Sequence, residues 1–127
     1  MKLEPFVRVD ATPFSATADD VVRTRGAPPR QAQNGVGLTA FDYGDVVFRF
    51  QDSGRLEEVT AQAPVLHFGV IAVPFDRLEA FIVEHDAAAF RRAGFLVSPR
   101  FGVAFDPREP CWVTALARHC LGAWVAL

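Results

Sequence analysis

The chain has 127 residues, of which half are hydrophobic and 22% are charged, so its length and composition fit one folded domain and exclude a disordered chain. Its 13 basic and 15 acidic residues leave a net charge of −2, which provides no basic surface for nucleic acid. Short apolar runs, no secretory signal and only two cysteines lead us to expect a cytoplasmic protein without a membrane partner.

The N-terminal quarter reads as a strand, a helix and a polar loop. Weak alternation predicts a strand over Phe6–Val9. A helix is predicted over Ser15–Arg25, because Ser15 or Thr17 can accept a free backbone N–H and two aspartates follow in the first turn. A Gly-Ala-Pro-Pro sequence ends this helix, and Gln31–Gly35 is expected to be a loop.

Three strand-like runs come next, over Val36–Phe41, Val46–Phe50 and Arg55–Ala63. In the second run the valine and phenylalanine side chains alternate with Arg49, which predicts one buried face and one solvated face. The turn-forming residues Gln51–Gly54 separate the last two runs, so these runs are expected to form a hairpin.

The second half begins with an apolar run, Val65–Val73, that is expected to be a buried strand or a strand-like connection. A helix then starts at Asp76, which forms a pattern resembling a capping box with Glu79. The segment Ala87–Ala93 is expected to extend this helix or to form a second short one, with a glycine after it.

A second set of strands is predicted after that glycine. Phe95–Val97 and Phe101–Phe105 alternate in the manner of strands, and Asp106–Pro110 is a turn. Cys111–Arg118 is expected to be a strand, and the apolar tail Leu121–Leu127 another strand or a packed terminus.

The two halves, about 1–64 and 65–127, follow the same order of a Pro-Phe pair, a helix and several strands. Val59–Ala61 and Val113–Ala115 repeat the same three residues. The sequence therefore predicts a single α+β domain of two weakly similar halves, each a helix followed by antiparallel strands. Both helices would pack on one face of the sheet, and the other face would be free to bind a partner or to dimerise.

A family resemblance rests on residues 14–61, through Gly26-Ala27-Pro28, Tyr43-Gly44 and Asp52-Ser53-Gly54-Arg55-Leu56. This pattern resembles small bacterial α/β repeat modules, those of the outer-membrane lipoprotein A family and of the tandem-repeat β-lactamase inhibitor proteins. The chain lacks the lipid-attachment cysteine and the secretory signals of those families, so their location does not transfer. The resemblance implies a protein-binding module without enzymatic activity.

Candidate chemical groups are few, and each has a simpler interpretation. His119 and Cys120 resemble an activated thiol, but neighbours on a strand point to opposite faces. His67, His85 and His119 have no histidine or cysteine partner at a recognised metal-ligand spacing. We therefore expect no metal, no cofactor and no catalytic residue, and whether His85, His119 and Cys120 converge stays open.

Charged residues give two further hypotheses. Glu57 and Glu58 supply carboxylates, but on a strand they are expected to face opposite ways and so not to act as a pair. Arg23, Arg25 and Arg30 surround the proline-containing loop and suit an anion or an acidic partner, although a solvated loop is the simpler interpretation.

The function that these observations favour is a small protein-binding module, of the kind found in immunity proteins or inhibitors. Its contact surface is expected on the free sheet face and on the loops Arg25–Gln33 and Asp106–Pro110. The expected binding residues are Arg25, Arg30, Tyr43, Trp112 and Trp124, because exposed aromatic and arginine side chains concentrate binding energy.

Two alternatives remain at this point. One is a small-ligand-binding protein or an enzyme with a pocket formed by histidine and cysteine. The other is a structural homo-oligomer, such as a homodimer, assembled through the apolar tail Ala123–Leu127.

Overall fold

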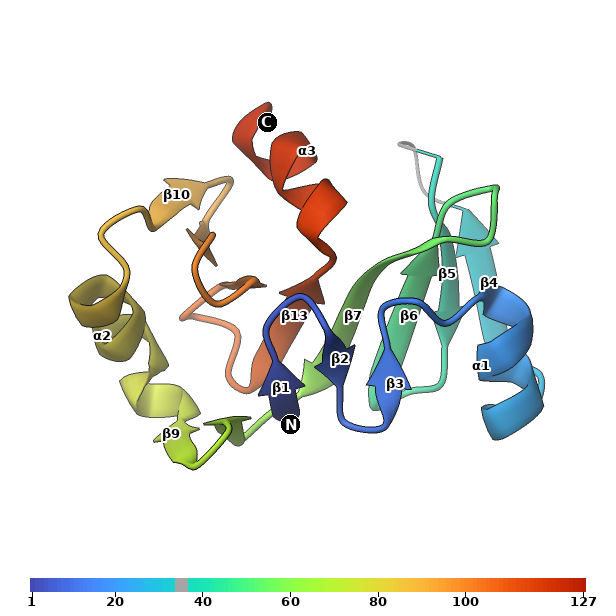
Figure 1. Cartoon of the computed structure of the whole chain (residues 1–127), viewed down its shortest axis with the longest axis horizontal. Coiled ribbons are helices and arrows are strands. Elements are labelled where there is room, and N and C mark those ends of the chain that lie inside the picture. Colours follow the sequence, from blue (N-terminus) through green and yellow to red (C-terminus); the bar gives the residue numbers. More distant parts are fainter. Residues whose placement is uncertain (34–36) are drawn as a thin grey trace.

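The computed structural model describes residues 1–33 and 37–127. Within these residues the fold is mixed α+β, with three α-helices and two sheets (Figure 1), which confirms the predicted class. No helix in this part of the chain is long and apolar enough to cross a membrane.

The larger sheet has eight strands, each antiparallel to its neighbours. In spatial order they are β10 (Phe90–Arg92), β11 (Phe95–Ser98), β12 (Val103–Phe105), β13 (Trp112–Leu116), β7 (Leu56–Gln62), β6 (Val46–Phe50), β5 (Thr39–Asp42) and β4 (Arg30–Gln33). Two four-stranded meanders, one from each half of the chain, therefore meet where β7 pairs with β13. At this junction Thr60 lies directly opposite Thr114.

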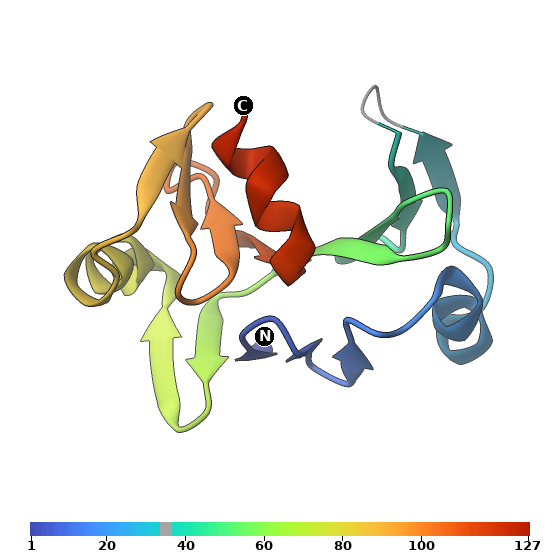
Figure 2. The ribbon, with the colours of Figure 1, turned by 45° about the horizontal axis from the view of Figure 1, so that its top comes forward.

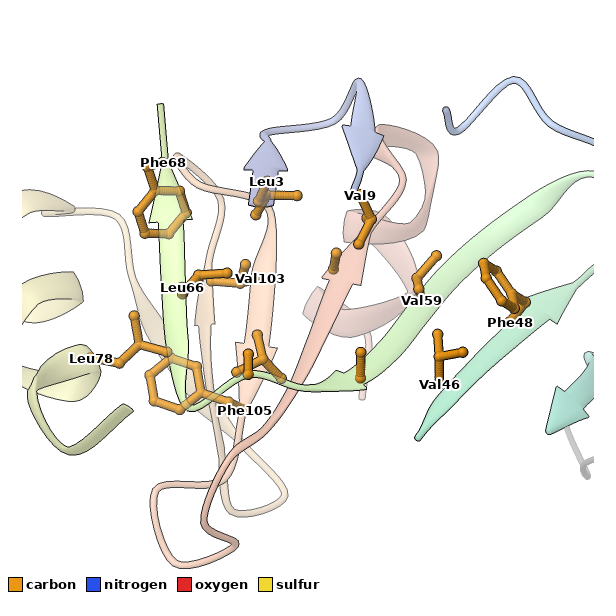
Figure 3. Packing of buried hydrophobic residues seen from close by; sticks show 14 of the residues in the cluster. Leu3, Val9, Val46, Phe48, Val59, Leu66, Phe68, Leu78, Val103 and Phe105 are labelled. Atoms are coloured by element: carbon orange, nitrogen blue, oxygen red, sulfur yellow. The ribbon is translucent and has the colours of Figure 1, made fainter. Parts of the chain in front are cut away.

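The smaller sheet combines both halves as well. Its strands, in spatial order, are β3 (Thr12–Pro13), β2 (Arg8–Val9), β1 (Lys2–Glu4), β8 (Val65–Phe68) and β9 (Ile71–Pro74), with only β1 and β8 parallel to one another. Leu3 and Leu66 from this sheet belong to the same buried cluster as Phe48 and Val103 of the larger sheet (Figure 3).

Helices α1 (Ala18–Arg25) and α2 (Phe75–His85) contribute to the same cluster, through Val21 and Leu78. A third helix, α3 (Leu121–Val125), follows a 3-10 turn, η1 (Arg118–Cys120), and packs on the opposite face of the larger sheet. In Figure 2 the N-terminal strands pass on one side of that sheet and α3 stands on the other.

Helix α1 forms as its sequence predicts. The Thr17 hydroxyl accepts the backbone N–H of Asp20, and the Asp20 carboxylate accepts the backbone N–H of Thr17, so Thr17 rather than Ser15 is the cap. Gly26 ends the helix at a φ of 82°, a left-handed value that glycine adopts without steric cost. The β6–β7 hairpin and the burial of Val46, Phe48 and Phe50 are confirmed too.

Helix α2 differs from its prediction at its start. It begins at Phe75, one residue before Asp76, and its first turn has no side-chain cap. Glu79 does not complete a capping box but pairs with Arg91 at 2.9 Å.

Several predicted elements were wrong because turns lie where the sequence indicated continuous structure. Val65–Val73 is a hairpin with an exposed turn at Gly69-Val70, not a single buried strand. Ala87–Ala93 is not helical, since β10 and β11 pair around Ala93-Gly94. Both turn residues have positive φ, 52° and 87°, the conformation that suits a two-residue hairpin.

Three further boundaries change. Gln31–Gln33 forms an edge strand rather than a loop, and residues 34 and 35 of the predicted loop lie outside the described residues. The next strand starts at Thr39, while residue 36 of its predicted range also lies outside them. The predicted strand at Leu121–Leu127 is wrong, because this tail is mostly α-helical.

Candidate functional site

The face of the larger sheet that carries α3 is concave. In Figure 2 the two ends of the sheet rise on either side of the helix. On this concave face the second half contributes Val97, Ala104 and Leu116, which form a buried apolar cluster with Cys120. Helix α3 therefore covers the apolar half of the face.

The first half of the concave face is polar and half-buried. Arg49 donates a hydrogen bond from Nη1 to Thr60 Oγ1 at 2.7 Å, and Thr60 Oγ1 shares another with Thr114 Oγ1 at 2.8 Å. Arg49 also lies 3.9 Å from the Glu58 carboxylate. A row of hydrogen-bonded side chains thus crosses the junction of the two meanders.

A depression of about 290 Å³ opens above this row of side chains, and we call it the tryptophan pocket. Its lining residues are Arg49, Glu58, Thr60, Phe95, Asp106, Glu109, Trp112, Thr114 and Trp124. Both tryptophans of the chain line it, one from β13 and one from α3. Both residues are half-buried, so each leaves part of its surface open to solvent.

Glu58 holds α3 against the sheet beside this pocket. Its Oε1 atom accepts the indole N–H of Trp124 at 3.2 Å and the Cys120 thiol at 3.4 Å. The Trp124 ring also meets Phe95 edge-on, with the ring centres 5.3 Å apart. The orientation of Trp124 is therefore set by the chain itself before any ligand arrives.

The carboxylates at the pocket differ in their partners. Asp106 accepts two side-chain hydrogen bonds from Arg108, both 3.1 Å, and these hold the pKa of Asp106 below its ordinary value. The exposed Glu109 side chain has no hydrogen bond or ion pair within residues 1–33 and 37–127. Glu109 is thus the one lining carboxylate that makes no ion pair among the described residues, although its charge contributes to the raised pKa of the neighbouring Arg108.

A second depression, of about 480 Å³, lies along the other side of α3. It shares Glu58 and Trp124 with the tryptophan pocket, and its other lining residues are Leu38, Gln51, Glu57, Cys120, Ala123, Ala126 and Leu127. The two depressions therefore border the same tryptophan.

The five predicted binding residues separate into three places. Trp112 and Trp124 come together in the tryptophan pocket. Arg25 and Tyr43 lie at the end of α1, where the guanidinium is 5.8 Å from the centre of the tyrosine ring and the tyrosine hydroxyl donates to the Gly26 carbonyl. Arg30 is exposed on the edge strand β4, opposite Asp42.

The three side chains considered for catalysis do not converge. His119 Nε2 lies 2.8 Å from the buried Glu57 carboxylate, and the Cys120 thiol donates to Glu58 and also interacts with Glu57, so only these two side chains share a neighbour. His85 is on α2, where its ring packs against Phe81. Burial, and then the nearby Glu58 carboxylate, raise the pKa of the Cys120 thiol strongly, so the thiolate needed of a nucleophile is disfavoured.

The prediction that Glu57 and Glu58 cannot come together was wrong. The pairing of β6 with β7 shifts register between Arg49 and Phe50, so the alternation of side chains is interrupted at Glu57. Both carboxylates consequently line the depression beside Cys120. No feature of the sequence indicated this bulge.

Sequence reasoning also missed Arg49 and Phe95 as parts of the site, whereas Glu109 lies in the loop Asp106–Pro110 that was expected to contact a partner. Arg49 was recognised as facing away from the core, which was the available signal. Within residues 1–33 and 37–127, no three histidine, cysteine or acidic side chains gather as metal ligands do. No protein-family model, no curated protein and no solved structure matches the chain.

Proposed function

We propose that this chain is a non-catalytic protein-binding module, of the immunity or inhibitor kind, and that it binds its partner with the concave face. The observation that carries the proposal is that its two tryptophans, one on β13 and one on α3, line one depression on that face. Tryptophans that are fixed in place and partly exposed are typical centres of protein interfaces.

The proposal includes a duplication of the two halves, which the strand pairing supports. Val59–Ala61 pairs with Val113–Ala115 so that the two copies of the Val-Thr-Ala sequence run in opposite directions about Thr60 and Thr114. A two-fold relation between the halves would produce this register. The resemblance of residues 14–61 to bacterial repeat modules agrees with it.

Under this relation, the concave-face positions of the two halves can be matched. In the first half, Thr60 lies opposite Val47 on the next strand, and Val47 lies opposite Asp42. In the second half, Thr114 lies opposite Ala104 in the same way, and Ala104 lies opposite Val97. The second half has only apolar residues at these positions and lies under α3, whereas the first half has a carboxylate, Asp42, next to Val47, and both residues are half-buried. We therefore assign recognition to the first half and to the pocket at the junction.

We place the module in the cytoplasm, since both cysteines are free thiols.

The test is photo-crosslinking in the cells that produce the protein. A benzophenone amino acid is placed at Ala123, an exposed residue of α3 beside Trp124, and the matched control carries it at Ala80, an exposed alanine of α2 on the other face. We expect a discrete adduct with another protein from position 123 and none from position 80. Adding Trp112→Ala should abolish that adduct.

Two results would contradict this function. Identical adducts from both positions would mean that the concave face is not the contact surface. An adduct containing two copies of this chain would favour the homo-oligomer instead.

A further inference from the structure

We propose that the tryptophan pocket receives the side chain of one arginine of the partner protein. The assignment rests on the proposed function, because it names the group that the partner inserts. The size of the pocket, its walls and its charge support this assignment.

The size of the pocket suits a single side chain. Its volume of about 290 Å³ is at the lower end of pockets that hold small molecules, which begin near 300 Å³. A cofactor-sized ligand would therefore extend well beyond it, whereas one long side chain can fill it from above.

The walls of the pocket favour a cation. Phe95, Trp112 and Trp124 contribute their aromatic rings, and a cation near such rings is attracted by their π electrons, most strongly by indole. Trp124 is already oriented by Glu58 and Phe95, so little ordering is needed when a ligand binds.

The charges of the pocket point the same way. Arg49 on the floor is balanced by Glu58, and Asp106 is balanced by Arg108. Glu109 is the remaining carboxylate, and the charge of Arg108 acts on it without an ion pair. Three carboxylates thus face two arginines at the pocket, so one negative charge is left over and a cation is favoured over an anion.

Arginine fits better than lysine for two reasons. A planar guanidinium can stack on an indole ring and still direct two N–H groups at one carboxylate, here that of Glu109. It also gives up its hydration more readily than an ammonium group, which matters between aromatic walls.

The test uses small probes and the chain's own tryptophans as reporters. The chain has only these two tryptophans, so an NMR spectrum shows two indole N–H signals: that of Trp112 reports on the tryptophan pocket, and that of Trp124 reports on both depressions. The probes are N-acetyl-arginine methylamide and its neutral isostere N-acetyl-citrulline methylamide, with the lysine and glutamate analogues alongside.

We expect the arginine probe to shift both indole signals in a saturable manner, and the citrulline probe to bind roughly tenfold more weakly because it lacks the charge. Glu109→Gln should weaken the arginine probe by a similar factor. Glu84→Gln is the matched control, since it removes an exposed carboxylate from α2 on the other face, and it should leave binding unchanged.

Three outcomes would overturn the assignment: citrulline binding as well as arginine, equal binding by the Glu109→Gln and Glu84→Gln variants, or preference for the glutamate probe. Stronger binding of the lysine probe would overturn the choice of arginine. The probe experiment needs no partner, so its failure leaves the crosslinking result intact. Conversely, specific probe binding without any adduct at position 123 would refute protein binding.

Discussion

Removing the Glu58 carboxylate should release α3 from the sheet, because this side chain makes the polar contacts that attach the helix. A helix of five residues is not stable by itself in water. A hydrogen bond to a charged group contributes about 1.5–3 kcal/mol, and Glu58 accepts one from the Trp124 indole in a partly buried setting. Its weaker contact with the Cys120 thiol adds about 1 kcal/mol at most, whereas its ion pair with Arg49 at 3.9 Å joins two strands of the sheet and does not hold α3.

For Glu58→Ala we therefore expect the free energy of detaching α3 from the sheet to fall by about 2–3 kcal/mol. The backbone amides of the helix should then exchange faster by about 30-fold or more. Glu58→Gln is the matched variant, since it keeps an oxygen that can accept the indole N–H, and it should lose about 1 kcal/mol or less. The measurements are hydrogen exchange at residues 121–127 and urea unfolding followed by tryptophan fluorescence.

The comparison of the two variants decides the matter. If Glu58→Ala and Glu58→Gln raise exchange at residues 121–127 equally, the indole hydrogen bond does not hold the helix. If neither raises it, packing of Trp124 on Phe95 alone is sufficient, and the attachment through Glu58 is refuted.

Two further predictions concern buried groups. Burial alone would raise the pKa of Asp86, but hydrogen bonds from the Ser98 hydroxyl and from the backbone N–H groups of Arg100 and Ala88 outweigh it and hold the pKa below the ordinary value. This contribution to stability is complete above the unfolded pKa of about 3.9 and is lost as pH falls through the folded pKa. The Asp86→Asn variant should therefore be less stable than the parent protein at neutral pH, and its free energy of unfolding, measured by urea titration, should decrease less on acidification. The raised pKa of Cys120 predicts that iodoacetamide modifies the half-exposed Cys111 first near pH 8, and peptide mass spectrometry showing equal rates in the folded protein would contradict it.

Elements determined by neighbouring residues could be predicted from the sequence. Helix α1 was predictable because its cap, Thr17, and its terminating glycine lie within the segment itself. The β6–β7 hairpin was predictable for a similar reason, since alternation fixes its buried face and four turn-forming residues connect its strands.

Elements that depend on distant partners could not be predicted. The apolar tail reads equally well as a strand, and its helical form depends on contacts of Trp124 with Phe95 and Glu58. In this tail, tertiary contacts outweigh the local pattern. The hairpin turn at Ala93-Gly94 was missed for a different reason: its strands are adjacent in the chain, but Ala93 adopts a φ of 52°, which is uncommon for alanine.

The candidate site belongs to this second group. Trp112 and Trp124 were predicted individually as binding residues, from their type. Their meeting depends on the pairing of β7 with β13 and on the return of α3 over that junction, both of which join residues far apart in the chain. Residue type therefore indicated the anchors, and only topology placed them together.

The polarity of the first half also restricts how a partner can bind. A second apolar helix that packed on the first half as α3 packs on the second would need apolar side chains beneath it. The second half provides Val97 and Leu116, whereas the matching positions of the first half hold Asp42 and Gln62. Such a helix would bury the Asp42 carboxylate, at a cost that its apolar contacts would not recover. We therefore infer that a partner approaches this half through polar contacts across a hydrated surface and concentrates its buried contact at the tryptophan pocket.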